Sequence, residues 1–190
     1  DYHKNQDIFE KYTLYQDLYD YTSGKNPLRM SFERYVLSAY FEQILEFANI
    51  ELLKMTQGRF ALYRKKDVKG VKQQGLDLSV LDYETGMMRD IQSLSGGESF
   101  KAALSLALGL SSMIQNYAGG IELNTLFIDE GFGTLDHESI DQALSVLMDL
   151  KNDHKTIGII SHVDELKERI DTQIIVEKGQ QGSSLHIERG

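Results

Sequence analysis

The stretch TLFIDEGFGTLD, residues 125–136, decides the fold of this chain of 190 residues. Its apolar run, residues 126–128, ends in two adjacent carboxylates, Asp129 and Glu130. A second apolar run, TIGII at residues 156–160, follows after an amphipathic segment. Short apolar strands separated by a helix are typical of parallel strands that are buried on both faces and joined by a right-handed crossover. We therefore expect an α/β fold with a mainly parallel sheet flanked by helices.

The two carboxylates at the end of the first strand have the Walker B arrangement. In this arrangement Asp129 would hold Mg²⁺, usually through water, and Glu130 would orient or deprotonate the attacking water. Two solvated acids that cap a strand are a common alternative. The functional interpretation gains weight because open α/β sheets bind ligands at the carboxyl ends of their strands.

Further polar groups follow the same two strands. The loop GFGTLD, residues 131–136, has the glycines that a tight turn needs, and Asp136 could serve only as the N-cap of the next helix. Ser161 and His162 end the second strand, where His162 could hydrogen-bond a terminal phosphate. A lone histidine at a strand end is more often structural than functional.

An earlier segment, LSGGE at residues 94–98, also has two interpretations. Ser95 and Glu98 form a capping box that opens a helix, which is a sufficient structural role. The same helix end presents N–H groups and a positive dipole to an anion, and Gly96 and Gly97 let a phosphate approach the backbone. One helix end contributes roughly 1–2 kcal/mol, whereas micromolar nucleotide binding needs about 8 kcal/mol. This segment therefore cannot form an ATP site alone.

The order of these four elements is more informative than any one of them. The chain contains, in this order, a glycine turn with a helix, a strand ending in Asp-Glu, a glycine loop with Asp and a strand ending in Ser-His. A P-loop of the form G-x-x-x-x-G-K-[ST] is missing from the sequence, where the only Gly-Lys pair is Gly24-Lys25. The sequence therefore predicts the half of a nucleotide site that acts on the γ-phosphate, without the Walker A half that grips the nucleotide.

The N-terminal segment, residues 1–22, carries a stripe of apolar and aromatic residues at spacings of four, three and four: Ile8, Tyr12, Tyr15 and Tyr19. This spacing fits the end of a coiled-coil helix and fits an ordinary amphipathic surface helix equally well. The stretch TSGKNP, residues 22–27, breaks the helix. We expect a second helix with one apolar face from Leu37 to Met55, and a domain that spans residues 28–190.

Composition sets further bounds. Hydrophobic residues make up 41% and charged residues 26%, as in an ordinary globular domain, and no apolar run is long enough to predict a membrane span. The absence of cysteine fits a reducing cytoplasm. The net charge of -9 disfavours nucleic-acid binding by bulk electrostatics. A local cluster in a strand-to-strand link could still contact the DNA backbone or be a solvated hairpin: Arg64, Lys65, Lys66, Lys69 and Lys72.

Three stretches, residues 93–100, 126–136 and 158–163, resemble the C-terminal lobe of the SbcC family of ATP-binding-cassette DNA-repair ATPases. Residues 1–22 look like the end of the family's long coiled coil. Glu98 and Gly131 stand where transporter ATPases usually carry Gln and Pro. The resemblance implies a bacterial cytoplasmic, nucleoid-associated protein whose own N-terminal lobe supplies Walker A. It also implies a homodimer of heads around ATP and Mg²⁺ that controls an SbcD-type nuclease acting on double-stranded DNA ends.

The resemblance also implies roles for individual residues. Ser95, Gly96 and Gly97, with Glu98 at the same helix end, would contact the γ-phosphate of the nucleotide on the second head. A second group would serve the nucleotide of its own head: Asp129 with Mg²⁺, and Glu130 and His162 in catalysis. Asp136 would lie in the loop that couples the two sites.

Two other classes of function remain open at this point. One is an architectural, chromosome-tethering module of the SMC type that dimerises on ATP with little hydrolysis, although such a module has no need of Glu130. The other is a nuclease metal site built from acids and a histidine: Asp129, Glu130, Asp136 and His162. That alternative leaves the LSGGE helix without a role.

Overall fold

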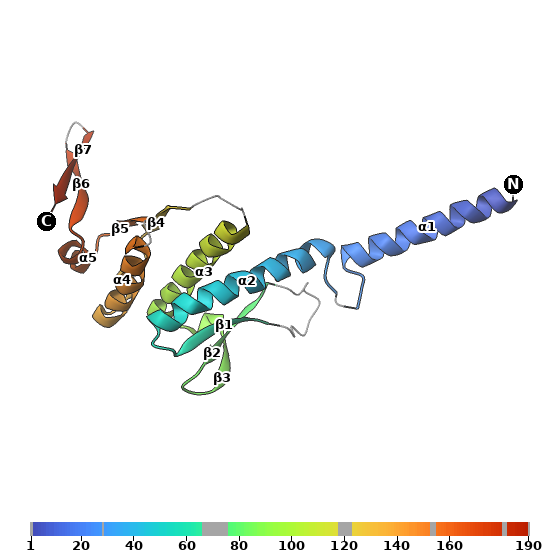
Figure 1. Ribbon diagram of the computed structural model, residues 1–190, viewed down its shortest axis with the longest axis horizontal. Coiled ribbons are helices and arrows are strands. Elements are labelled where there is room, and N and C mark those ends of the chain that lie inside the picture. The colour runs from blue at the N-terminus through green and yellow to red at the C-terminus, as the bar shows by residue number, and fades with distance from the viewer. Residues whose placement is uncertain are drawn as a thin grey trace. The chain divides into compact units, whose positions relative to one another are not determined.

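The computed structural model describes residues 2–27, 29–65, 76–117, 123–152, 155–179 and 182–189 (Figure 1). The chain divides into two compact units, Asp1–Leu123 and Asn124–Gly190. No helix among the described residues has the length and apolar character needed to cross a bilayer.

The first unit begins with helices and continues with a small sheet. Its elements are α1 (Tyr2–Ser23), α2 (Phe32–Met55), β1 (Phe60–Arg64), β2 (Leu78–Asp82), β3 (Met87–Asp90), the short 3₁₀ turn η1 (Ile91–Ser93) and α3 (Gly96–Tyr117). Ser31 caps α2 and accepts a hydrogen bond from the Arg34 N–H, one turn after the helix break that the sequence predicts. The helix over residues 1–22 is confirmed, whereas its place in a coiled coil stays a prediction.

The core of the first unit lies between α2, α3 and one face of the sheet. It contains Leu45, Leu52, Phe60, Leu62, Val80 and Ala102. The predicted apolar face of α2 is buried from Leu45 to Met55, whereas Leu37 at its start is exposed. Asn49 ties α2 to β1, because its side chain accepts the Leu62 N–H at 2.7 Å and donates to the Leu62 carbonyl at 2.9 Å.

The helices α2 and α3 lie side by side (Figure 1). They approach each other closely at Gly109. A Cβ atom at this position would lie 2.5 Å from the Ile44 carbonyl oxygen and 2.7 Å from the Ala48 nitrogen. Both contacts are with backbone, which cannot rotate away as a side chain can. Gly109 is therefore required by the packing of the two helices, even though glycine is unfavourable inside a helix.

We expect Gly109→Ala to lower the free energy of unfolding by about 1–3 kcal/mol, because overpacking outweighs the gain of about 1 kcal/mol in helix propensity. Thermal unfolding measures the change. The matched control is Ala107→Gly on the exposed side of α3, which should cost about 1 kcal/mol from propensity alone. A Gly109→Ala variant more stable than the parent would contradict the close approach.

The second unit contains a parallel strand pair and an antiparallel hairpin. Its elements are β4 (Thr125–Asp129), η2 (Phe132–Thr134), α4 (His137–Asn152), β5 (Thr156–Ile160), α5 (Asp164–Arg169), β6 (Thr172–Gly179) and β7 (Gly182–Arg189). β4 and β5 pair in parallel, with α4 between them in the chain, so this part of the prediction is confirmed. The buried face of α4 contains Ile140, Ala143, Leu144, Val146 and Leu147.

The α/β class is confirmed, but parallel pairing is confined to β4 and β5 among the described strands. β1, β2 and β3 form an antiparallel sheet, and β6 and β7 form an antiparallel hairpin. The turns from β2 to β3 and from β6 to β7 are too short for the crossover that parallel neighbours need. The expectation of burial on both faces is also wrong in this chain, because Phe127 on β4 is 71% exposed.

Candidate functional site

The pairing of β4 with β5 places the ends of both strands at one edge. Asp129 lies opposite Ile160, and the Glu130 N–H continues the ladder by donating to the Ile160 carbonyl at 2.8 Å. Asp129 and Glu130 are both exposed at this edge. The edge is where open α/β sheets bind their ligands.

Glu130 and His162 meet directly at this edge. His162 Nδ1 lies 3.2 Å from Glu130 Oε1 and 3.1 Å from Oε2. The Glu130 side chain is 52% exposed and the His162 ring 79% exposed, so both groups face solvent. The structure thus brings together the two residues that the sequence predicts to be catalytic, through strands that are remote in the chain.

The backbone at Glu130 has an unusual conformation. Its φ is 61°, in the left-handed region that costs a non-glycine residue roughly 1–2 kcal/mol, and Gly131 follows with a φ of 99°. Strained backbone of this kind is concentrated at functional sites. The two left-handed residues turn the chain sharply out of β4 at the point where the carboxylate is presented.

The glycine loop after Glu130 is anchored by a buried side chain and lies against His162. Phe132 is fully buried and anchors the loop. A Cβ atom on Gly133 would lie 3.8 Å from His162 Cε1, so loop and ring are neighbours. Asp136 Oδ1 accepts the Ser139 N–H at 2.8 Å and thereby caps α4. The capping role considered for Asp136 is therefore present, and a role in coupling two sites stays a prediction.

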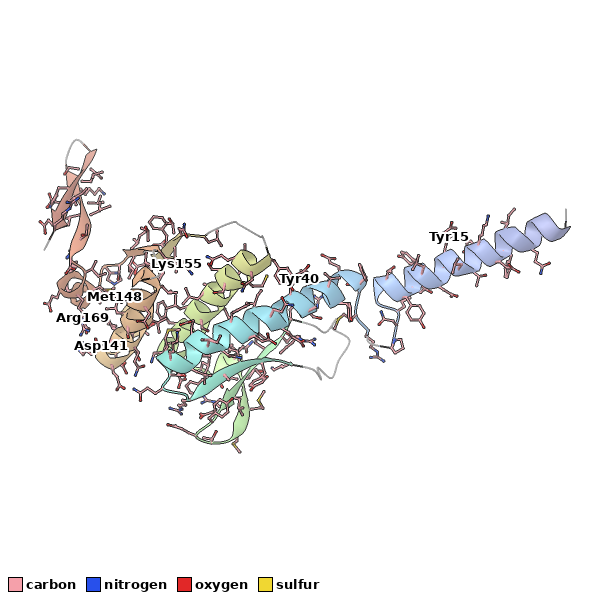
Figure 2. The ribbon with its side chains drawn as sticks, viewed as in Figure 1. Tyr15, Tyr40, Asp141, Met148, Lys155 and Arg169 are labelled. Atoms are coloured by element: carbon pink, nitrogen blue, oxygen red, sulfur yellow. The ribbon has the colours of Figure 1, made fainter. Side chains whose placement is uncertain are left out.

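Ion pairs tie α5 to α4 close to the segment that carries His162. Arg169 on α5 pairs with Asp141 on α4 (Figure 2) and donates to Glu165 at 2.9 Å. His137 Nδ1, at the start of α4, lies 2.5 Å from Glu165 Oε2. The helix α5 begins two residues after His162. These ion pairs therefore restrict the path of the chain between β5 and α5.

The LSGGE segment forms the capping box at the start of α3. The Glu98 N–H donates to Ser95 Oγ at 3.3 Å, and the Ser95 N–H donates to Glu98 Oε2 at 2.8 Å. Gly96 and Gly97 are the first residues of the helix. Ser95 and Gly96 are exposed, so an anion has access to this helix end.

The described part of the basic cluster is engaged in ion pairs. Arg64 donates to Glu42 Oε1 from Nε at 2.8 Å and from Nη2 at 2.6 Å. Lys65 Nζ lies 2.5 Å from Asp90 Oδ2. Lys66, Lys69 and Lys72 lie outside the described residues. DNA binding by this cluster stays a prediction.

The nuclease alternative requires several metal ligands in one place. Over the part of the chain that the structure describes, no group of three or more His, Cys, Asp or Glu side chains is arranged to hold a metal ion. A role for Asp129 toward the Mg²⁺ of a bound nucleotide stays a prediction.

Comparison with known proteins bears on this arrangement of motifs. Residues 71–149, which include both LSGGE and Asp129-Glu130, match the family model described as SbcC/RAD50-like, Walker B motif. The chain is 49% identical over 187 residues to the SbcC subunit of the SbcCD nuclease of Vibrio cholerae. The resemblance to the SbcC family is confirmed. The match covers 98% of this chain and 18% of that SbcC protein.

A second SbcC relative gives the same result. The SbcC subunit of the SbcCD nuclease of Staphylococcus aureus strain JH9 is 43% identical over 186 residues, which cover 97% of this chain and 18% of that protein. The chain therefore spans less than a fifth of the length of these curated relatives and corresponds to their C-terminal region.

Solved structures show the fold. A chain from work on ATP-driven dimerization and DNA-stimulated activation of SMC ATPases aligns with a TM-score of 0.62 at 16% identity, over 81% of this chain and 88% of that one. The Pyrococcus furiosus Smc head with an extended coiled coil aligns with a TM-score of 0.58 at 16% identity, over 82% and 37%. The chain thus has the fold of the C-terminal part of an SMC-like ATPase head and carries a Walker B region.

The capping role of Asp136 can be separated from any other role by two substitutions. We expect Asp136→Ala to lower the free energy of unfolding by about 1 kcal/mol, because the Ser139 N–H loses its acceptor. Asp136→Asn should leave stability unchanged, since Asn is an equally good N-cap. Thermal unfolding of both variants measures the difference, and equal stability of the Ala variant and the parent would show that this cap contributes nothing.

Proposed function

We propose that this chain is the γ-phosphate-handling half of an SbcC-type ATPase head that dimerises around ATP and controls a nuclease acting on double-stranded DNA ends. The observation that supports this most directly is the Glu130–His162 pair at the carboxyl edge of β4 and β5. A carboxylate and an imidazole in contact, both open to solvent, are suited to a water and a phosphate respectively.

Within this proposal each residue at the edge has a separate task. Asp129 would hold the Mg²⁺ of the bound nucleotide, which when present neutralises charge on the phosphates. Glu130 would orient the attacking water and accept its proton at a carboxylate oxygen. His162 would direct its Nε2 toward the terminal phosphate, while Nδ1 lies against Glu130.

The start of α3 would serve the nucleotide of a second copy. Ser95 Oγ and the N–H groups of Gly96 and Gly97 lie at a helix end that favours a phosphate. Because one helix end supplies only roughly 1–2 kcal/mol, it can complete a site but cannot hold a nucleotide alone. The proposal therefore requires the Walker A lobe from elsewhere in the complete protein.

Exposed apolar side chains on β4, β6 and β7 support the proposal that another lobe packs against the second unit. The register of β6 and β7 pairs Ile174 with Ile187 and Val176 with Leu185, so the four side chains share one face of the hairpin. All four are exposed, as is Phe127 on β4. A contiguous apolar face on a soluble domain marks an interaction site, and the Walker A lobe is the partner that the sequence lacks.

The N-terminal helix also exposes apolar surface, which supports a coiled-coil partner and a nuclease partner. Ile8, Tyr12, Tyr15 and Tyr19 on α1 are all exposed, and Figure 2 shows Tyr15 projecting from this helix. We assign α1 and the start of α2 to the surface that meets the coiled-coil partner helix and an SbcD-type nuclease. The DNA contact would come from the complete assembly, because the chain itself carries a net charge of -9.

The division of the site can be tested by reconstitution. We expect the chain alone to show no ATP turnover, and a mixture with a separately expressed N-terminal lobe to turn over ATP with Mg²⁺, because only the mixture holds Walker A. A Walker A Lys→Ala lobe in the same mixture is the control. Robust turnover by the chain alone would overturn the half-site, and ATP-dependent dimers with no turnover would favour the architectural SMC-type module.

The role of Glu130 is tested by Glu130→Gln in the complete SbcC-type protein. We expect ATP turnover to fall about 10²–10⁴-fold, the usual contribution of a general base, and the ATP-bound dimer to persist. Size-exclusion chromatography and phosphate release measure the two effects. Glu138→Gln, an exposed acid in the first turn of α4, is the matched control and should leave turnover unchanged. Unchanged turnover in Glu130→Gln would remove Glu130 from this role.

A further inference from the structure

A buried carboxylate lies on the hairpin that leads into the LSGGE segment. Asp82 ends β2, and only 1% of its side chain is exposed. It is bonded to two guanidinium groups: Arg59 Nη2 and Arg89 Nη1 each lie 3.2 Å from Asp82 Oδ2. Its Oδ1 accepts the Glu84 N–H at 3.0 Å. A buried charge with this many donors is fully satisfied and holds both arginines in place.

Arg89 extends this cluster to the turn before α3. Its Nη2 donates to the Ser93 carbonyl at 3.0 Å and its Nε to Ser93 Oγ at 3.3 Å. Ser93 Oγ in turn donates to the Asp90 carbonyl at 2.6 Å. Ser93 precedes Leu94 and the capping residue Ser95, so Arg89 bridges the buried carboxylate and the start of the LSGGE segment.

Further contacts hold both arginines of the cluster in place. Arg59 also pairs with Glu84 at 2.9 Å and stacks over the Phe60 ring at 4.7 Å, and Arg89 lies over the same ring at 5.9 Å. Arg59 donates hydrogen bonds to Asp82 and holds the pKa of that carboxyl below its usual value. Asp82 therefore stays ionised at neutral pH, and the bridge is present under the conditions in which an ATPase works.

From this geometry we propose that Arg89, held by Asp82, is a positioning residue for the LSGGE turn. It sets where Ser95, Gly96 and Gly97 present their donors to the nucleotide on a second head. This inference rests on the proposed function of that helix end. A guanidinium suits the task because its planar fork bonds Asp82 and Ser93 together, whereas the compact ammonium of lysine has no such fork.

Nucleotide binding and dimerisation should respond differently to the loss of Arg89. The partners of Arg89, Asp82 and Ser93, belong to the first unit, whereas the groups assigned to the head's own nucleotide belong to the second. Displacing the LSGGE turn should therefore spare nucleotide binding by a single head and weaken the ATP-dependent association of two heads. Loss of a charge-assisted hydrogen bond corresponds to about a 10-fold or larger change in an equilibrium constant.

The test uses Arg89→Lys in the complete SbcC-type protein, with Arg59→Lys as the matched control. Arg59 is also bonded to Asp82, but its second partner is Glu84 and not Ser93. Lysine at this position keeps the positive charge that acts on Glu98. We expect Arg89→Lys to bind ATP at low protein concentration as the parent does, and to dimerise about 10-fold more weakly with a non-hydrolysable ATP analogue. Its turnover should fall in proportion, and Arg59→Lys should dimerise within about 2-fold of the parent.

Dimerisation of Arg89→Lys at the parent's level, with equal thermal stability, would overturn the inference. An equal loss in both variants would assign the cluster to folding only, and would overturn it too. If Arg89→Lys fails to fold, Arg89→Gln keeps part of the side-chain stem and a neutral donor but removes the guanidinium that reaches both Asp82 and Ser93; unchanged dimerisation of that variant overturns the inference. A parent protein that neither dimerises on ATP nor hydrolyses it would instead overturn the proposed function.

Discussion

Glu130 meets His162 because β4 and β5 pair in parallel with Asp129 opposite Ile160. Strand side chains alternate between faces, so a shift of one residue in this register would turn Glu130 to the opposite side. The Glu130 N–H bond to the Ile160 carbonyl extends the same register one residue beyond β4. The buried apolar face of α4 and the anchoring of Phe132 then fix the loop that follows. The geometry of the candidate site is thus a consequence of one backbone register.

Several motif residues satisfy backbone groups at the starts of helices. Ser95 and Glu98 cap α3, yet the first N–H groups of a helix have no partners within it. Asp136 caps α4 in the same way. A sequence with only the capping role would not need Gly96 and Gly97, since a capping box works with ordinary helix formers at these positions. The pair of glycines is therefore the part of the motif that capping leaves unexplained.

The sequence predicted the elements with a strong local signal. The parallel pair β4–β5 and the capping box follow from apolar runs and from residues such as Ser95 that have strong positional preferences. The prediction of burial failed, because burial depends on which other elements cover a strand. The apolar run from Leu126 to Ile128 does not indicate whether Phe127 is buried. The sequence also did not predict the ion pair between Asp82 and Arg89. A single acid and a single arginine on neighbouring strands have no distinctive spacing, and only the β2–β3 register brings them together.

The exposure of the Glu130–His162 pair argues for a site completed by another surface. Electrostatic catalysis depends on donors and acceptors fixed in a site from which water is excluded. Glu130 and His162 are mostly open to solvent, so their contact is screened by water in this chain. The left-handed backbone at Glu130 fixes where the carboxylate leaves the strand, but it excludes no water. A second head that presents an LSGGE helix end would supply both the missing phosphate donors and the cover. Hydrolysis would then be coupled to dimerisation by the physical requirements of the reaction, without a separate regulatory device.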